Sequence, residues 1–413
     1  METAPRRRWN PLRLPLYQQI LVALCIGAAL GLTLGTQVAP LGVLAKWIIE
    51  LIKLLAIPLL FLAILDGVLS HAFAVRGVGA LFAISAGNAT GAILIALVVS
   101  NVFRPGQWLD LRHALPPSAK AMPAVDASPG HIAALLLGSP MVLAILLALA
   151  VGILVWLLQR VELGKRATAP LSGWVAAGLK LAMRLMGWVV RLTPLAVFGA
   201  VAKVLGEHGL SMMGGLAAYV GFCVLGMGLH VLLVYHTWVV LVAGIPLRRF
   251  WKASREPVVY GFGINSSLAT LPVTLQALED LKVSPGAARL SACVGTNFNN
   301  DGILLYEVVA VLFLAQAYGI ELSLASQLGA AVVAVAATIG VGGIPEAGII
   351  SLSLVLGALH LPAEAIPLLL TVDWVVARCR SAVNVLGDLS VAVAIDAVRG
   401  KDAAVAAQEG DAA

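Results

Sequence analysis

Residues 373–388 read Asp-Trp-Val-Val-Ala-Arg-Cys-Arg-Ser-Ala-Val-Asn-Val-Leu-Gly-Asp, inside an otherwise apolar stretch over 363–398. Arg380, Asn384 and Asp388 are spaced by four residues, so a helix places them on one face. An ionised side chain at the centre of a membrane helix costs on the order of 2.5–3.5 kcal/mol on insertion scales. This polar stripe therefore faces a binding site, or it holds helices together through an ion pair between Arg380 and Asp388.

The whole chain is too apolar for a soluble protein. Of its 413 residues 60% are hydrophobic and 12% are charged, and the mean hydropathy is +0.97. Soluble domains carry about 25% charged residues. The net charge of +6 comes from short clusters such as residues 6–8 and 165–166 between apolar segments. That pattern indicates membrane topology and argues against a nucleic-acid partner. The composition predicts an all-α polytopic membrane protein with room for about eight spanning helices.

The first half of the chain reads as ordinary spans. A cytoplasmic N-terminus is predicted over 1–14, and the first apolar run is too long for a cleaved signal peptide, so it is expected to remain as a span. Five prolines mark 104–130 as a loop. Basic clusters in alternate loops fall on the same side as the N-terminus, and the C-terminus joins them if the remainder crosses an even number of times. The predicted spans are about 15–36, 41–69, 77–102, 131–159, 170–203 and 210–243.

The second half differs because two of its apolar segments are interrupted at their centres. One runs over 250–280 and carries turn-forming and polar residues at 263–272; the other runs over 324–361 and is interrupted at 338–348. Paired interruptions of this kind are the best sequence indication of a transporter binding site. Two ordinary kinked spans are the alternative. The segments that follow, 286–317 and 363–398, are expected to be unbroken helices that carry polar residues.

The helix predicted over 286–317 carries a cluster of amides and a carboxylate. Asn297, Asn299, Asn300 and Asp301 lie within five residues of one another. This density indicates local unwinding, with oxygen atoms available to a hard cation. No Cys or His lies near enough in sequence to make a transition-metal set, so an alkali cation fits better.

Other polar residues receive no binding role. The histidines are His71, His113, His131, His208, His230, His236 and His360, and they are scattered near predicted span ends or in loops. The four cysteines are isolated, which predicts neither disulfides nor a zinc site. Glu50, Lys53 and Asp66 in the second span are expected to pair helices.

At these residues the chain resembles the glutamate transporter family, the dicarboxylate/amino acid:cation symporters, from the first span to Asp388. Residues 266–274 resemble the serine-rich tip of the first hairpin of that family. Residues 299–302 resemble its N-M-D-G-T motif, and 339–348 resemble the tip of the second hairpin. The stretch 373–388 resembles its last helix.

The resemblance implies eight transmembrane helices plus two re-entrant hairpins and a homotrimer. Within 15–248, helices 1, 2, 4 and 5 would form a scaffold, whereas helices 3 and 6 would join a transport core over 249–398. That core would move vertically, and the second hairpin would act as a gate. Residues 399–413 are expected to be a disordered tail. The gate residues implied are Gly340, Gly342, Pro345 and Glu346.

The resemblance also implies cation sites. Gly295, Asn299, Asn384 and Asp388 match the ligands of one sodium site. A second site in the family joins Asp301 and Asn299 to a tyrosine, a threonine and a serine of the third span. In this chain the third-span positions are Ser85, Asn88 and Ala89, so the second site is partly eroded. Stoichiometry, and the choice between Na⁺ and H⁺, stay open.

The implied substrate is a small anion. Arg380 matches the arginine that grips a second carboxylate, whereas Asn384 and the backbone at Ser267 would hold the first. Ala377 stands where amino-acid carriers have an aspartate for the ammonium group. Two substrates remain open: a dicarboxylate such as succinate, malate or fumarate, or glutamate or aspartate with Glu346 as the ammonium partner. The implied substrate-binding residues are Ser266, Ser267, Arg380, Ser381, Asn384, Ala377, Ile303 and Gly343.

The leading hypothesis is a cation-coupled symporter in a bacterial inner membrane, with both termini cytoplasmic and with no bound cofactor. A proton-coupled carrier of another small solute is the alternative. A channel would need a continuous polar path. An intramembrane enzyme could use Ser266, Asp301 or Asp373 as nucleophile or acid/base, but these residues lack a partner base.

Overall fold

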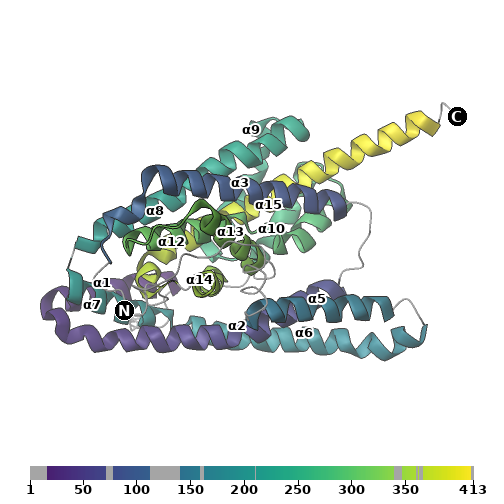
Figure 1. Ribbon diagram of the computed structural model, residues 1–413. Coiled ribbons are helices and arrows are strands. Elements are labelled where there is room, and N and C mark those ends of the chain that lie inside the picture. Colours follow the sequence, from purple (N-terminus) through teal and green to yellow (C-terminus); the bar gives the residue numbers. More distant parts are fainter. Residues whose placement is uncertain are drawn as a thin grey trace, which may run out of the picture.

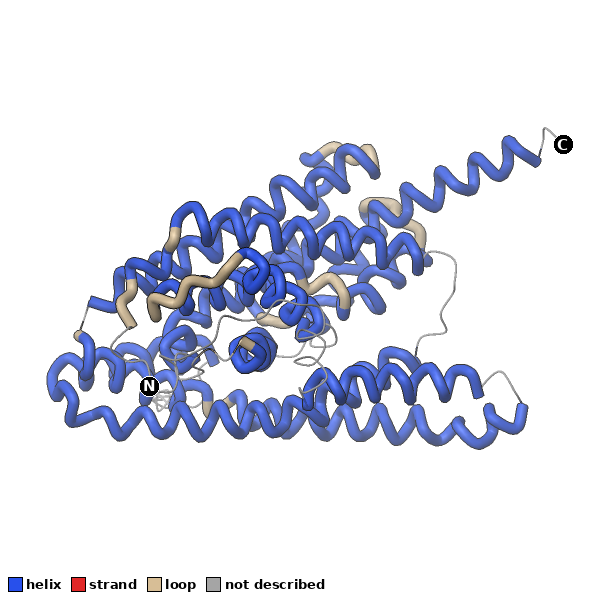
Figure 2. The backbone as a smooth tube through the Cα atoms, in the orientation of Figure 1, coloured by secondary structure: helices blue, strands red, loops and turns tan. Residues whose placement is uncertain are grey.

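The computed structural model describes residues 16–70, 78–111, 140–158, 162–209, 211–338, 347–359, 361 and 366–410. Throughout that part of the chain every regular element is a helix (Figure 2). This confirms the all-α prediction.

One group of helices comes from the first half of the chain. It contains α1 (Leu16–Leu34), α2 (Gly42–Ser70), α5 (Pro140–Leu158), α6 (Glu162–Val190) and α7 (Thr193–His208). Helix α2 packs on α5, α6 and α7, and α1 packs on α7. These helices lie along one side of the molecule, at the bottom of Figure 1.

The stretch predicted as one unbroken span over 170–203 is bent, although its two helices together remain long and apolar enough to cross a membrane. Helix α6 ends at Val190 and α7 begins at Thr193, with a 40° bend between them. Pro194 lies in the first turn of α7. Its ring removes a backbone donor and disfavours helical conformation in the preceding residue, so the helix breaks here. Helix α6 also begins eight residues earlier than predicted, at Glu162.

The second group surrounds α12 (Asp301–Ala317), whose residues are all buried apart from Gln316. Helices α3 (Val78–Phe103), α8 (Ser211–His230) and α15 (Ile366–Gly410) pack on α12. Two π-helical turns, Val231–Tyr235 and Trp238–Val242, continue α8. Figure 1 shows this group above α2, α5 and α6.

The two predicted interrupted segments each form a pair of helices. Helices α9 (Leu247–Ile264) and α10 (Ser267–Asp280) are separated at Asn265, which has a left-handed φ of +58° that asparagine tolerates better than most residues. Helices α13 (Leu324–Thr338) and α14 (Ala347–Ala358) pack on each other and on α12. The interruption of the first segment is confirmed, whereas residues 339–346 lie outside the described part.

The prediction of an unbroken helix over 286–317 is wrong, but the local unwinding predicted within it is confirmed. The chain forms α11 (Pro285–Arg289), a π-helical turn over Leu290–Val294 and a 3-10 turn over Gly295–Asn297 before α12 begins at Asp301. The polar residues of 297–301 cannot all be satisfied inside a regular apolar helix, so the backbone opens where they gather.

The expected disordered tail differs from the structure as well. Helix α15 continues to Gly410, so within the predicted tail 399–413 the residues outside the described part are 411–413. The sequence after Gly400 is rich in alanine and other strong helix formers, which favours continuation of the helix.

Four described helical stretches are long and apolar enough to cross a membrane, and there is a fifth if the bent pair α6 and α7 counts as one span. The four stretches are Val22–Leu44, Gly79–Phe103, Met213–Val242 and Leu368–Gly400. The predicted total of eight spans stays a prediction.

Helices α1 and α7 approach closely through glycine. A Cβ atom at Gly31 would lie 2.7 Å from the carbonyl oxygen of Ala202 and 3.0 Å from the Cβ of Leu205. Gly27 lies one turn earlier and meets the carbonyl of Phe198 in the same way. Small residues four apart allow two membrane helices to pack backbone to backbone.

We therefore expect Gly31→Leu to lower the free energy of unfolding by about 1–3 kcal/mol, because the added side chain overpacks this contact. Thermal unfolding of the purified protein in detergent measures the change. Gly221→Leu is the matched control, since nothing lies within 4 Å of a Cβ at that glycine of α8. Equal stability of the two variants would contradict this packing.

Candidate functional site

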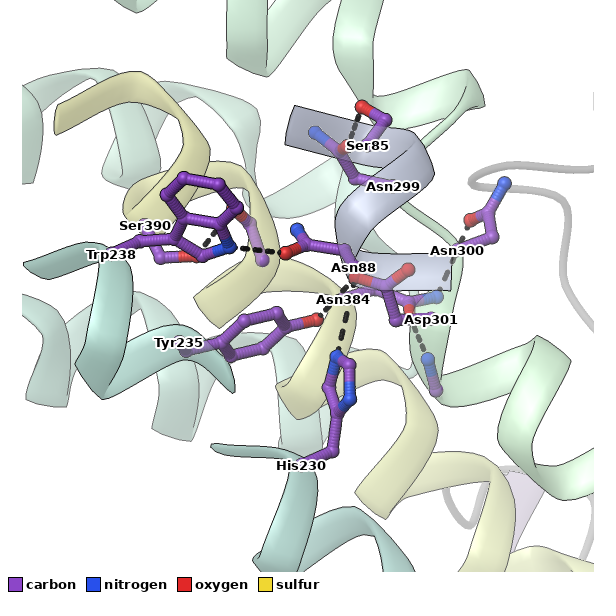
Figure 3. Close-up of polar contacts among 12 residues, drawn as sticks. Ser85, Asn88, His230, Tyr235, Trp238, Asn299, Asn300, Asp301, Asn384 and Ser390 are labelled. Atoms are coloured by element: carbon purple, nitrogen blue, oxygen red, sulfur yellow. Dashed lines mark hydrogen bonds and ion pairs between the residues drawn. The ribbon is translucent and has the colours of Figure 1, made fainter. Parts of the chain in front are cut away.

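Polar side chains from four parts of the chain converge where the backbone opens ahead of α12. Asn299, Asn300 and Asp301 come from that opening, and Asn384 comes from α15. Figure 3 shows Asn299 beside Ser85 of α3, and Asp301 beside Tyr235 of the first π-helical turn after α8. The three opening residues are each at most 2% exposed, so their polar atoms need protein partners.

The carboxamide of Asn384 joins the start of α12 to α15. Its Oδ1 accepts a hydrogen bond of 2.9 Å from the backbone N–H of Gly302, and its Nδ2 donates to Asn300 Oδ1 at 3.4 Å. Asn300 in turn donates to the carbonyl of Thr338, at the end of α13, at 3.0 Å. These two side chains thus link the unwound backbone, the last helix and the second interrupted segment.

A second set of oxygens gathers around Asn299. The hydroxyl of Ser85 donates to Asn299 Oδ1 at 2.6 Å, and Asn299 Nδ2 lies 3.5 Å from Asp388 Oδ1. The carbonyl of Gly295 accepts from the backbone N–H groups of Phe298 and Asn299 at 2.7 and 2.8 Å. The predicted ligands Gly295, Asn299 and Asp388 are therefore adjacent, and Asn384 lies one turn from Asp388 on α15. Their carbonyl and carboxylate oxygens are the donors that a hard cation prefers.

Arg380 forms a separate buried cluster on α15. The side chain is about 4% exposed, and its Nη2 lies 3.1 Å from Asp373 Oδ2. The guanidinium carbon lies 4.0 Å from the centre of the Tyr306 ring, a cation–π contact. A Cβ atom at Gly348 of α14 would collide with the guanidinium, so that glycine leaves room for it. Arg380 is thereby held at a fixed place between α12, α14 and α15.

The tip of the first interrupted segment reaches both clusters. Ser381 of α15 donates from its hydroxyl to Asn265 Oδ1 at 2.8 Å. The hydroxyl of Thr296 lies 3.4 Å from that of Ser267. Ser266 precedes Ser267 in the same tip, and its carbonyl accepts from Thr270 at 2.8 Å. Residues 265–267 therefore lie between the opening before α12 and the Arg380 end of α15.

Not every predicted site residue is in this group. Ile303 packs in an apolar cluster with Ile48, Leu65 and Ala200 of the first group of helices. Ala377 is buried on α15, one turn before Arg380 and Ser381. The remaining predicted residues, Gly340, Gly342, Gly343, Pro345 and Glu346, lie outside the described residues.

The structure also brings in residues that were given no binding role from the sequence. Tyr235 donates from its hydroxyl to Asp301 Oδ2 at 2.8 Å, and His230 Nε2 lies 3.5 Å from the same oxygen. Trp238 donates from its indole to Asn88 Oδ1 at 2.6 Å. All three come from α8 and its π-helical turns. The position of His230 inside a membrane span was the available signal, because a buried ionisable residue there marks a functional site.

Because the carboxamide of Asn384 links α12 to α15, its removal should lower the stability of the protein. We expect Asn384→Ala to lower the free energy of unfolding by about 1–3 kcal/mol, because the buried N–H of Gly302 loses its partner. Chemical or thermal unfolding in detergent measures this. Ser390→Ala is the control, since that hydroxyl only donates to the carbonyl of Gly387 within α15. A loss no larger than that of the control would contradict the linkage.

Comparison with known proteins identifies the family to which the chain belongs. The model of the sodium:dicarboxylate symporter family matches residues 16–398. The chain is 28% identical to C4-dicarboxylate transport protein 4 of Bradyrhizobium diazoefficiens, over 97% of this chain and 93% of that protein. It is 29% identical to the C4-dicarboxylate transport protein of Rhodospirillum rubrum, covering 95% and 90%. The match to the protein of that name from Bordetella avium is also 29%, covering 92% and 88%. The chain therefore belongs to the sodium:dicarboxylate symporter family and is an integral membrane transporter, not an enzyme.

Proposed function

We propose that this chain is a secondary active symporter that carries a C4-dicarboxylate together with a cation, most simply Na⁺. The observation that carries the proposal is the buried Arg380, held in place by Asp373 and Tyr306 beside the tip of the first interrupted segment. A guanidinium presents parallel N–H donors that match a carboxylate. Its position on the same helix as Asn384 and Asp388 gives one helix contact with both substrate and cation.

The substrate class follows from the groups around Arg380. Asp373 is already paired with Arg380, and Ala377 supplies only a methyl group where an ammonium would need a carboxylate. A buried ammonium without a partner is costly. A dicarboxylate without an amino group therefore fits better than an acidic amino acid. The names of the bacterial relatives support the same choice.

The cation follows from the oxygen donors around Asn299. Gly295, Asn299 and Asp388 lie together as carbonyl, amide and carboxylate donors, and the matching family is named for sodium. Proton coupling is the second candidate because Glu307 of α12 is fully buried close to Arg380. A carboxyl group at that depth in a membrane helix could carry a proton along with the substrate.

We further propose that transport follows an elevator mechanism in a homotrimer. The first group of helices would form the fixed scaffold and the group around α12 would move, with the segment that joins α13 to α14 as the gate. The packing within each group supports this division, and the two groups meet where α7 packs on α15 and where Ile303 of α12 joins the apolar cluster of the first group (Figure 1). A bacterial inner membrane with cytoplasmic termini fits the basic loops and the bacterial relatives.

Uptake by the purified protein in liposomes tests the function. Radiolabelled succinate, aspartate and glutamate are compared under an inward sodium gradient, a proton gradient, or neither. We expect sodium-driven succinate uptake without amino-acid uptake. Equal aspartate uptake would show that another group holds the ammonium, and gradient-independent uptake would contradict symport.

Arg380→Cys should abolish succinate uptake, because it removes the partner of one substrate carboxylate. A charged hydrogen bond is worth about 1.5–3 kcal/mol, which corresponds to roughly a 10- to 100-fold loss of affinity. Arg378→Cys is the matched control, since that side chain donates to the carbonyl of Trp374 within α15. Unchanged succinate uptake by the Arg380 variant would contradict the role of Arg380 as the partner of a substrate carboxylate.

A further inference from the structure

The carboxylate of Asp301 is the candidate cation ligand whose surroundings depart furthest from the expected site. It is 1% exposed, and its Oδ2 atom has two partners from the α8 segment. The hydroxyl of Tyr235 donates at 2.8 Å and the imidazole Nε2 of His230 lies at 3.5 Å (Figure 3). The rings of His230 and Tyr235 are themselves packed edge to face, with centres 4.7 Å apart.

The backbone is built to bring these partners to Asp301. The π-helical turn Val231–Tyr235 adds a residue to the helical repeat and so changes the direction in which later side chains point. Gly387 of α15 leaves room for the Tyr235 side chain, because a Cβ atom at Gly387 would lie 2.7 Å from the hydroxyl of Tyr235. Helix α3 is equally close, since a Cβ at Gly91 would meet Val234 at 2.7 Å and the His230 ring at 3.8 Å.

The third-span residues do not offer Asp301 the oxygen ligands of a cation site. The Ser85 hydroxyl donates to Asn299, and the Asn88 oxygen is taken by the indole N–H of Trp238 at 2.6 Å. Ala89 has no side-chain oxygen at all. The groups that meet Asp301 Oδ2 are a phenol O–H, whose proton is donated to the carboxylate, and an imidazole nitrogen, which a hard cation disfavours as a ligand.

We infer that His230 and Tyr235 take the place of a coupling cation at Asp301. This carboxylate is buried and is contacted by groups of the protein in place of a coupling ion. Of the two cation sites that the resemblance implies, only the Gly295, Asn299 and Asp388 site then binds sodium, so the chain couples to fewer sodium ions than the resemblance implies. The inference rests on the proposed cation coupling for its second half, but the pairing of His230 with Asp301 stands independently of it.

A double-mutant cycle tests the pairing without reference to transport. Thermal unfolding in sodium-free buffer is measured for wild type, His230→Ala, Asp301→Asn and the double variant. Each single change should lower the unfolding temperature by about 2–5 °C. The double variant should be no less stable than the weaker single variant, because both changes remove the same interaction. Additive losses would overturn the pairing.

Two further variants keep the cycle interpretable. His230→Gln retains a donor and should recover at least half of the stability lost in His230→Ala. His236→Ala is the matched control on the same segment, since that histidine is bonded to Trp251 and not to Asp301. A loss in the control as large as in His230→Ala would count against a specific role for His230.

Measuring the unfolding temperature at increasing sodium concentration tests whether sodium binds at the Asp388 site and not at Asp301. Wild type and Asp301→Asn should show the same sodium-dependent rise, whereas Asp388→Asn should show none. A rise that disappears in Asp301→Asn would overturn the inference. If sodium does not shift wild type at all, sodium coupling in the proposed function fails, and the double-mutant cycle still decides whether His230 and Asp301 are partners.

Discussion

The unwound backbone ahead of α12 is the constraint on which the rest of the site depends. Peptide groups at membrane depth have no water to bond to, so an opened turn survives only where the protein satisfies it. Asn384 accepts from the N–H of Gly302, and Asn300 bonds the end of α13. The same side chains that stabilise the opening thereby bring the last helix and the second interrupted segment together. Binding chemistry and fold stability share these contacts.

Two clusters of opposite character result along α15. Around Arg380 the protein holds a buried cation with Asp373 and the Tyr306 ring, which suits an incoming carboxylate. Around Asp388 it places a buried carboxylate beside the amide group of Asn299, and carboxylate and amide groups suit a cation. Asp388 lies eight positions after Arg380 on one helix, so a substrate and an ion can be bound by the same rigid element. This proximity is a physical route to coupling, because movement of one helix displaces both sites.

Much of this arrangement could be predicted from the sequence. The composition required a membrane protein, and the four-residue spacing from Arg380 to Asp388 placed their polar side chains on one helical face. The turn-forming residues around Asn265 marked a real interruption, and the amides of 297–301 marked a real opening. The same reasoning missed the bend in 170–203, where Pro194 breaks an apolar run that looked continuous, and it failed for the C-terminal tail, where α15 continues.

The sequence by itself determined the chemistry of the stripe on α15 and of the cluster before α12, because spacing along one helix sets which side chains share a face. Only the tertiary structure decided which groups meet across helices. Tyr235 and Asp301 are 66 residues apart, and their contact depends on a π-helical turn and on the space left by Gly387. No local pattern encodes such a contact, since it requires three helices to pack in one register. His230 therefore gained its partner, Asp301, only when the helices were placed together.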